Sequence, residues 1–196
     1  MSRAIFETSH FYDAARGLVS EIGPAAVTVD AITQRLKAPK GSFYHRFESR
    51  DSLLGDIWLQ ALTSFQEGFF AAIESGDGLA AALHTPRWSR SHLEDACLLL
   101  LYNRKDFVQG DWPAKLKLAV QERTAAFENA LKQFSRQAFG RAGASQIRRA
   151  TYILAEAPVA AVKGHLQRRE APPAIVDDLV TCTYRAIVEY WDLDKG

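Results

Sequence analysis

The amino-acid sequence predicts an all-α protein, with an N-terminal three-helix unit that contains a helix-turn-helix and a larger helical domain after it. Apolar residues recur at helical spacing along most of the 196 residues. Residues 28–45 have the pattern of two short helices joined by a tight turn, and a third, longer helix follows directly. We therefore expect two domains, one of residues 1–48 and one of residues 49–196.

The composition is that of an ordinary soluble globular protein. Apolar residues make up 47% of the chain and charged residues 24%, and the net charge is +1. We recognise no signal peptide and no apolar run of about 18 residues, so we expect a cytoplasmic protein without a membrane partner. Cys97 and Cys182 stand far apart and match no metal or redox spacing, so we expect no metal and no cofactor.

The first helix is expected to begin at Thr8 or Ser9, with either residue as its cap. Gly23 fits the position just past the helix end, and Pro24 marks the stop. An apolar stripe along this helix would hold the next two helices in register. The stripe consists of Phe11, Ala14, Ala15, Leu18, Val19 and Ile22.

Local signals define the helix-turn-helix. The Thr28 hydroxyl can cap the first of the two helices, and Val27 and Ile32 are spaced like a hydrophobic staple around that cap. Lys37-Ala38-Pro39 ends this helix, because a residue before proline is pushed out of the helical region. The second helix spans Lys40 to His45, and in such motifs the second helix enters the major groove of DNA.

The side chains of this second helix suit contact with DNA. Lys40, Ser42, Tyr44 and His45 offer hydrogen-bonding groups, while Gly41 is small enough to approach a sugar–phosphate edge. Phe43 and Phe47 lie four residues apart and are expected to fix the short helix to the core. Between positions 35 and 50 there are five basic residues and one acidic residue, a local charge of +4 in a nearly neutral chain.

This stretch resembles the DNA-binding domain of the TetR family of transcriptional regulators. The resemblance covers about a quarter of the chain and extends upstream to Gly23 and the pair Ala14-Ala15. Lys37 stands where the family usually has glycine, and Arg46 and Arg50 replace commoner residues. The residues that carry the resemblance are Val27-Thr28-Val29, Ile32, Leu36, Lys40-Gly41-Ser42-Phe43-Tyr44-His45, Phe47, Ser49-Arg50 and Leu53-Leu54.

The resemblance implies a function. It predicts a repressor that binds a palindromic double-stranded operator as a homodimer and is released by a small hydrophobic or amphipathic effector. The domain after residue 48 would then serve ligand binding and dimerisation. Carried over by position, the residues facing DNA would be Thr28, Lys40, Gly41, Ser42, Tyr44, His45 and Arg50.

The second domain is expected to contain at least six helices. A long helix from Ser49 to about Ser75 would connect the two domains and could act as a lever between them. Pro158 falls inside a later helix, either as a tolerated kink or to leave the Leu154 carbonyl free for a ligand. A short helix is expected at 79–83, and residues 84–86 would break it. The remaining helices are expected from Ser89 or Ser91 to Tyr102, from Asp111-Trp112-Pro113 to Phe139, from Ser145 to 167–169, and from Ile175 onward.

Aromatic residues in the body are candidates for an effector pocket, because pockets in helical bundles are lined mainly by such side chains. The alternative is that each of them is simply part of the core. The candidates are Leu62, Phe65, Phe69, Trp88, Tyr102, Phe107, Trp112, Phe127 and Tyr152.

The last two long helices mix small and bulky apolar residues, which favours either a dimer interface or an ordinary internal core. The dimer candidates are Ile153, Ala157, Ala161, Leu179, Cys182 and Ala186. No catalytic or metal-binding spacing is present, which argues against an enzyme. Two other functions stay open: a DNA-binding regulator without a small-molecule ligand, and a helical protein-interaction module.

Overall fold

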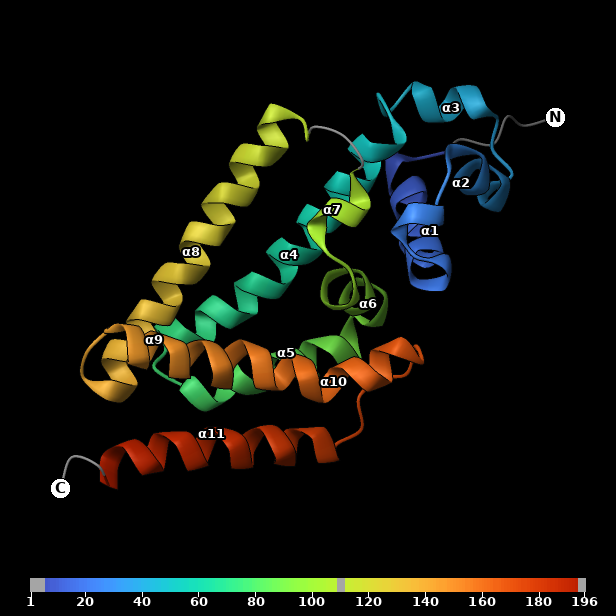
Figure 1. Ribbon diagram of the computed structural model, residues 1–196. Helices are drawn as coiled ribbons and strands as arrows, with labels where there is room; N and C mark the ends of the chain where they lie inside the picture. Colours follow the sequence, from blue (N-terminus) through green and yellow to red (C-terminus); the bar gives the residue numbers. More distant parts are fainter. Residues whose placement is uncertain (1–5, 109–111, 194–196) are drawn as a thin grey trace. The chain divides into compact units, whose positions relative to one another are not determined.

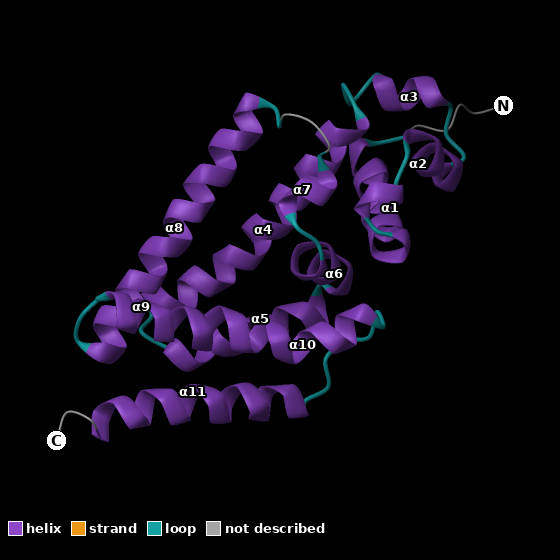
Figure 2. Ribbon diagram, viewed as in Figure 1, coloured by secondary structure: helices purple, strands orange, loops and turns teal. Residues whose placement is uncertain are grey.

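The computed structural model describes residues 6–108 and 112–193, and all regular elements within these ranges are helices (Figures 1 and 2). The chain forms two compact units. The first consists of Met1–Leu62 and Glu94–Val120, and the second of Thr63–Leu93 and Gln121–Gly196. The predicted boundary after residue 48 separates a DNA-binding domain from a domain for ligand binding and dimerisation. This division of function stays a prediction.

The first unit begins with the three predicted N-terminal helices. These are α1 (Thr8–Ile22), α2 (Val29–Leu36) and α3 (Lys40–Tyr44), and a short 3-10 turn (Pro24–Ala26) joins α1 to α2. Helix α1 begins where the sequence indicates, but its cap is Glu7, whose backbone N–H donates to Nδ1 of His10 over 3.1 Å. The prediction of Thr8 or Ser9 as the cap was therefore wrong by one or two residues.

Helix α4 (Arg50–Glu74) starts at a predicted cap, where the Ser49 hydroxyl accepts from the backbone N–H of Ser52 over 3.0 Å. Residues 50–62 belong to the first unit and residues 63–74 to the second. The first unit also contains α7 (Arg104–Phe107), most of α6 (Leu93–Leu101) and the start of α8 (Ala114–Phe139). Asp111, at the predicted start of α8, lies outside the described residues.

The first unit has one apolar core, which α1, α2, α3 and α4 share with parts of α6, α7 and α8. Its largest fully buried side chains are Phe11, Ile32, Phe43, Leu53, Leu54, Ile57, Leu98 and Phe107.

The second unit is built from the later helices. They are α5 (Gly78–Ser91), the rest of α8, α9 (Ala144–Thr151), a π-helical segment η2 (Tyr152–Glu156), α10 (Ala157–Gln167) and α11 (Ile175–Leu193). Helix α5 contacts η2, α10 and α11.

Pro86 and Pro158 both lie within helical segments, but in different positions. The predicted break at residues 84–86 was wrong, since α5 continues through Pro86, whose side chain is buried together with Thr85 and Ser89. Packing of this face offsets the backbone hydrogen bond that proline cannot make. Pro158 lies at the second residue of α10, directly after the π-helical segment, where the Ala157 N–H donates to the Tyr152 carbonyl five residues back.

Candidate nucleic-acid interface

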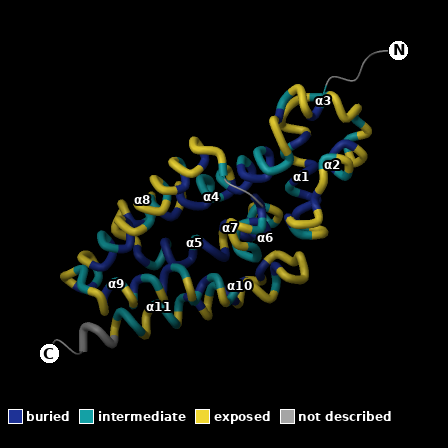
Figure 3. Tube along the Cα trace, turned by 45° about the horizontal axis from the view of Figure 1, so that its top comes forward, coloured by how far each residue is buried: buried dark blue, intermediate teal, exposed yellow. Residues whose placement is uncertain are grey.

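Helix α3 is fixed to the core by one side and open on the other. Phe43 is fully buried and Phe47 nearly so, and their ring centroids lie 5.2 Å apart. Phe11 of α1 contacts both rings, at 6.1 Å and 5.9 Å. The predicted role of Phe43 and Phe47 is therefore confirmed, and the residues of α3 other than Phe43 are exposed or half-buried (Figure 3).

The solvent side of α3 carries most of the predicted DNA-contacting residues. Tyr44 exposes 55% of its surface although it is a large aromatic residue. Ser42 is half-buried, and its hydroxyl donates to the Pro39 carbonyl over 2.6 Å. The exposed residues in this group are Thr28, Lys40, Gly41, Tyr44 and His45.

The turn before α3 forms as the sequence indicates. The Thr28 hydroxyl accepts from the Ala31 backbone N–H over 3.1 Å, which caps α2. Lys37 ends that helix with φ 52° and ψ 37°, in the left-handed region. A side chain is unfavourable there, which explains why glycine suits this position better.

Lys40 has a close acidic neighbour. Its Nζ lies 2.7 Å from Oδ1 of Asp30 on α2, although more than half of each side chain is exposed. The hydrogen bond and the charge of Asp30 raise the pKa of the Lys40 ammonium. Lys40 is therefore a cation at neutral pH, in an ion pair on the exposed side of the motif.

Arg46 supports α3 from within the unit. Its guanidinium donates to the carbonyl oxygens of Ser42, over 2.8 Å, and of Phe6, and it lies 5.5 Å from the ring centroid of Phe11. These contacts fix the end of α3 to the segment before α1.

Arg50 is turned toward backbone carbonyls of the first unit. Only 16% of its side chain is exposed. Its guanidinium donates to the carbonyl oxygens of Val27 (2.9 Å), Phe107 (3.2 Å) and Pro24, and to Oδ1 of Asp51 (2.5 Å). Arg50 thus joins the start of α4 to the α1–α2 connection and to α7, and its predicted DNA contact stays a prediction.

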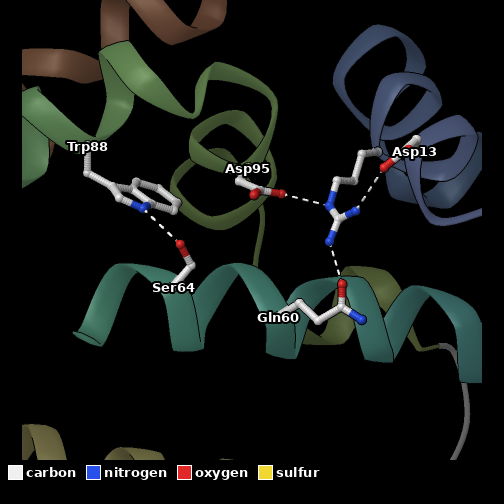
Figure 4. A network of polar contacts seen from close by, with 6 residues as sticks. Asp13, Gln60, Ser64, Trp88 and Asp95 are labelled. Carbon is white, nitrogen blue, oxygen red and sulfur yellow. Dashed lines mark hydrogen bonds and ion pairs between the residues drawn. The ribbon is translucent and has the colours of Figure 1, made fainter. Parts of the chain in front are cut away.

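A second arginine joins three helices of the same unit. Arg16 of α1 donates to Asp95 of α6 over 2.9 Å, to Asp13 over 3.3 Å and to Gln60 of α4 (Figure 4). No local pattern indicates this network, because two of its partners, Gln60 and Asp95, lie 44 and 79 residues away from Arg16. It connects helix α6 to α1 and α4 within one compact unit.

Residues 11–57 match the sequence pattern of the bacterial regulatory proteins of the tetR family. The chain belongs to the TetR family. The matched residues include α2, α3 and the start of α4, so the family assignment and the exposed helix α3 concern the same part of the chain. The protein is thus a DNA-binding transcriptional regulator. A search of curated proteins gave no match.

The effector candidates of this TetR-family protein are distributed over both units. Leu62, Tyr102, Phe107 and Trp112 belong to the first unit and the other five to the second. In the second unit Phe65 contacts Phe69 and Trp88, with ring centroids 6.2 Å and 5.3 Å apart, and Phe69 contacts Phe127 at 5.2 Å. The Trp88 indole N–H also donates to the Ser64 hydroxyl over 3.2 Å (Figure 4).

Tyr152 is separate from this aromatic cluster. It is 42% exposed and lines a pocket of about 480 Å³ within the second unit, between α9, η2 and α11. Arg148 and Arg149 contribute the polar part of the wall, while Ala186 and Ile187 contribute apolar surface from α11. Arg148 is paired with both carboxylate oxygens of Glu156, at 2.8 Å and 2.9 Å.

The dimer candidates separate by exposure. Ile153 is buried within the single chain, and Ala157 and Ala161 are half-buried. Leu179, Cys182 and Ala186 are exposed, and together with exposed Ile175 they recur every three or four residues along α11. We call these four residues the α11 stripe.

Neither a membrane-spanning helix nor a metal-binding cluster is found among the described residues. Within residues 6–108 and 112–193, none of the helices combines the length and the apolarity that crossing a membrane requires. The same residues contain no group of three or more histidine, cysteine, aspartate or glutamate side chains placed to hold a metal ion.

Proposed function

We propose that this TetR-family regulator is a homodimeric repressor that binds a palindromic operator and is released by a small apolar or amphipathic effector. The observation that carries the proposal is the exposed side of α3, where Lys40, Tyr44 and His45 are open to solvent while Phe43 and Phe47 fix the helix from below. A helix that is held to the core on one side and carries hydrogen-bonding side chains on the other suits insertion into the major groove.

The contacts divide into two kinds. Thr28 and Tyr44 would position the protein on the phosphate backbone, while Lys40, Ser42 and His45 would lie closest to the base edges. Gly41 would allow close approach to the sugar–phosphate edge. The Ser42 hydroxyl would keep its bond to the Pro39 carbonyl as a donor and still accept from a base.

Dimerisation would use the α11 stripe. Leu179 exposes 56% of its surface and Ile175 57%, which is unusual for large apolar side chains at regular helical spacing. The small residues Ala157 and Ala161 of α10 would allow close helix packing in a four-helix bundle. A two-fold dimer would place two copies of α3 on half-sites about 34 Å apart or a multiple of that distance.

The effector would bind in the second unit. The pocket beside Tyr152 has a volume typical of small-molecule sites, and its mainly apolar wall suits an apolar or amphipathic molecule. Helix α4 begins at the helix-turn-helix and continues into the second unit, so a shift of this helix would change the spacing of the two reading helices. The effector would then lower DNA affinity, and DNA would lower effector affinity by the same factor.

The stoichiometry of the DNA complex tests this proposal. A duplex selected by the purified protein from random sequence would be titrated and its mass measured by light scattering. We expect two protomers on one palindromic duplex, and mass spectrometry of the denatured protein should identify any effector that was bound. One protomer on a non-palindromic site would contradict the dimeric repressor.

A further inference from the structure

The ion pair between Lys40 and Asp30 has a consequence for sequence selectivity. Lys40 is the first residue of α3, and Asp30 lies in the first turn of α2. The separation of Nζ and Oδ1 is 2.7 Å, a good length for a charge-assisted hydrogen bond. Both side chains are more than half exposed, and Lys40 is one of the residues proposed to contact DNA.

The ion pair is unfavourable for binding to the phosphate backbone of DNA. Phosphates attract cations regardless of sequence, and Asp30 places a negative charge next to a lysine that could otherwise act as a point charge on any duplex. The pair as a whole is neutral. Asp30 therefore lowers the contribution of Lys40 to non-specific affinity.

The same geometry is compatible with reading a base. A lysine ammonium has three donors, and one of them is directed to Asp30. The other two stay available for acceptors such as O6 and N7 of guanine in the major groove. The contact to Asp30 also restricts a flexible side chain to one side of α3, which favours an acceptor at one defined position.

We propose that Asp30 is a specificity-determining residue, which holds Lys40 for a base edge and lowers its attraction to phosphates. This inference rests on the proposed DNA contact of Lys40. A purely structural alternative is that Asp30 serves only the positive end of the α2 dipole. The two accounts differ in whether the effect of Asp30 depends on Lys40.

The experiment compares Asp30→Asn, Lys40→Ala and the double variant with the wild type. Fluorescence anisotropy would measure the affinity for two duplexes, one selected by the wild-type protein from random sequence and one scrambled, over a series of salt concentrations. Asp13→Asn is the matched control, because it removes an exposed carboxylate of the same unit that pairs with Arg16 on α1. Thermal unfolding of each variant reports any loss of helix stability.

We expect Asp30→Asn to raise affinity for the scrambled duplex by roughly two- to fivefold, the range that exposed ion pairs contribute, with little change on the selected duplex. Its log–log salt slope on the scrambled duplex should become steeper by about one phosphate contact. In the Lys40→Ala background the same substitution should change the ratio of the two affinities much less. Asp13→Asn should leave that ratio unchanged.

Three results would overturn the inference. If Asp30→Asn changes the ratio of the two affinities equally with and without Lys40, Asp30 acts only through its general charge or through the α2 dipole. An unchanged affinity ratio in Asp30→Asn, with weakened binding in Lys40→Ala, would refute the role of Asp30 and leave the DNA contact of Lys40 intact. Unchanged binding in Lys40→Ala would refute both that contact and the role of Asp30.

Discussion

The guanidinium of Arg50 donates from Nε to the carbonyl oxygen of Val27 over 2.9 Å. Val27 directly precedes Thr28, the cap of α2, and the same guanidinium also reaches the carbonyl of Phe107 at the end of α7. One side chain at the start of α4 thus joins the entry of the helix-turn-helix to a segment more than fifty residues away along the chain.

This geometry predicts that Arg50→Lys destabilises the protein. Lysine keeps the charge but lacks the planar fork that serves several acceptors at once, so we expect a loss of about 1–3 kcal/mol in the free energy of unfolding. Urea denaturation measures this loss. A lysine could replace arginine as a phosphate ligand, so unchanged stability with unchanged DNA affinity would favour the phosphate contact that the sequence resemblance implies.

Lys37 is expected to be a mildly strained position. Its φ of 52° is unfavourable for a residue with a side chain, so Lys37→Gly should raise the free energy of unfolding by roughly 0.5–1 kcal/mol. Gln34→Gly in the same helix is the control and should instead lower it by about 1 kcal/mol. Thermal unfolding of both variants measures these changes in stability. A loss of stability in Lys37→Gly would show that the lysine side chain makes a compensating contact.

The α11 stripe predicts how the protein assembles. Leu179→Asp should convert a dimer into a monomer, because a buried charge at an apolar interface is unfavourable. Leu118→Asp on α8 is the matched control, since Leu118 is 57% exposed and Leu179 56%, yet Leu118 lies outside the stripe. Light scattering at micromolar concentration measures the mass. A monomeric wild type, or a dimer that persists in Leu179→Asp, would contradict the proposed interface.

His84 predicts a dependence of stability on pH. Burial lowers the pKa of His84 below its ordinary value of 6.5, although its Nε2 lies 2.7 Å from the Phe65 carbonyl and that bond acts in the opposite direction. The unfolded chain therefore binds the proton more readily than the folded chain. Stability should be complete above pH 6.5 and should fall as the pH drops below it.

Thermal unfolding at about pH 7.5 and about pH 5.5 tests the role of His84. In His84→Gln, which can still donate to the Phe65 carbonyl, the difference between the two pH values should become smaller. An undiminished difference in His84→Gln would assign the pH dependence to other groups.

Much of the helix-turn-helix could be predicted because its signals are local. The cap at Thr28, the end of α2 before Pro39 and the inward side of α3 at Phe43 each depend on residues within a few positions of one another. Such features follow from backbone preferences and helical spacing.

Other features depend on distant parts of the chain. The continuation of α5 through Pro86 requires the packing of η2, α10 and α11 against that helix, which no local pattern indicates. The inward orientation of Arg50 depends on the Phe107 carbonyl, and the ion pair of Lys40 depends on the turn that brings α2 and α3 together. Sequence alone indicated a basic surface here but did not show that the guanidinium groups of Arg46 and Arg50 support the fold from within.

We propose that the exposed side of α3 reads DNA. The most direct test is selection of bound fragments from genomic DNA by the purified protein, in parallel with a variant that combines Lys40→Ala and Tyr44→Ala. Both side chains are exposed, so the variant should fold with unchanged thermal stability. We predict that the wild type enriches a palindromic sequence and that the variant does not. Equal enrichment by both proteins, or no enrichment by a wild type shown to carry no bound small molecule, would contradict the account.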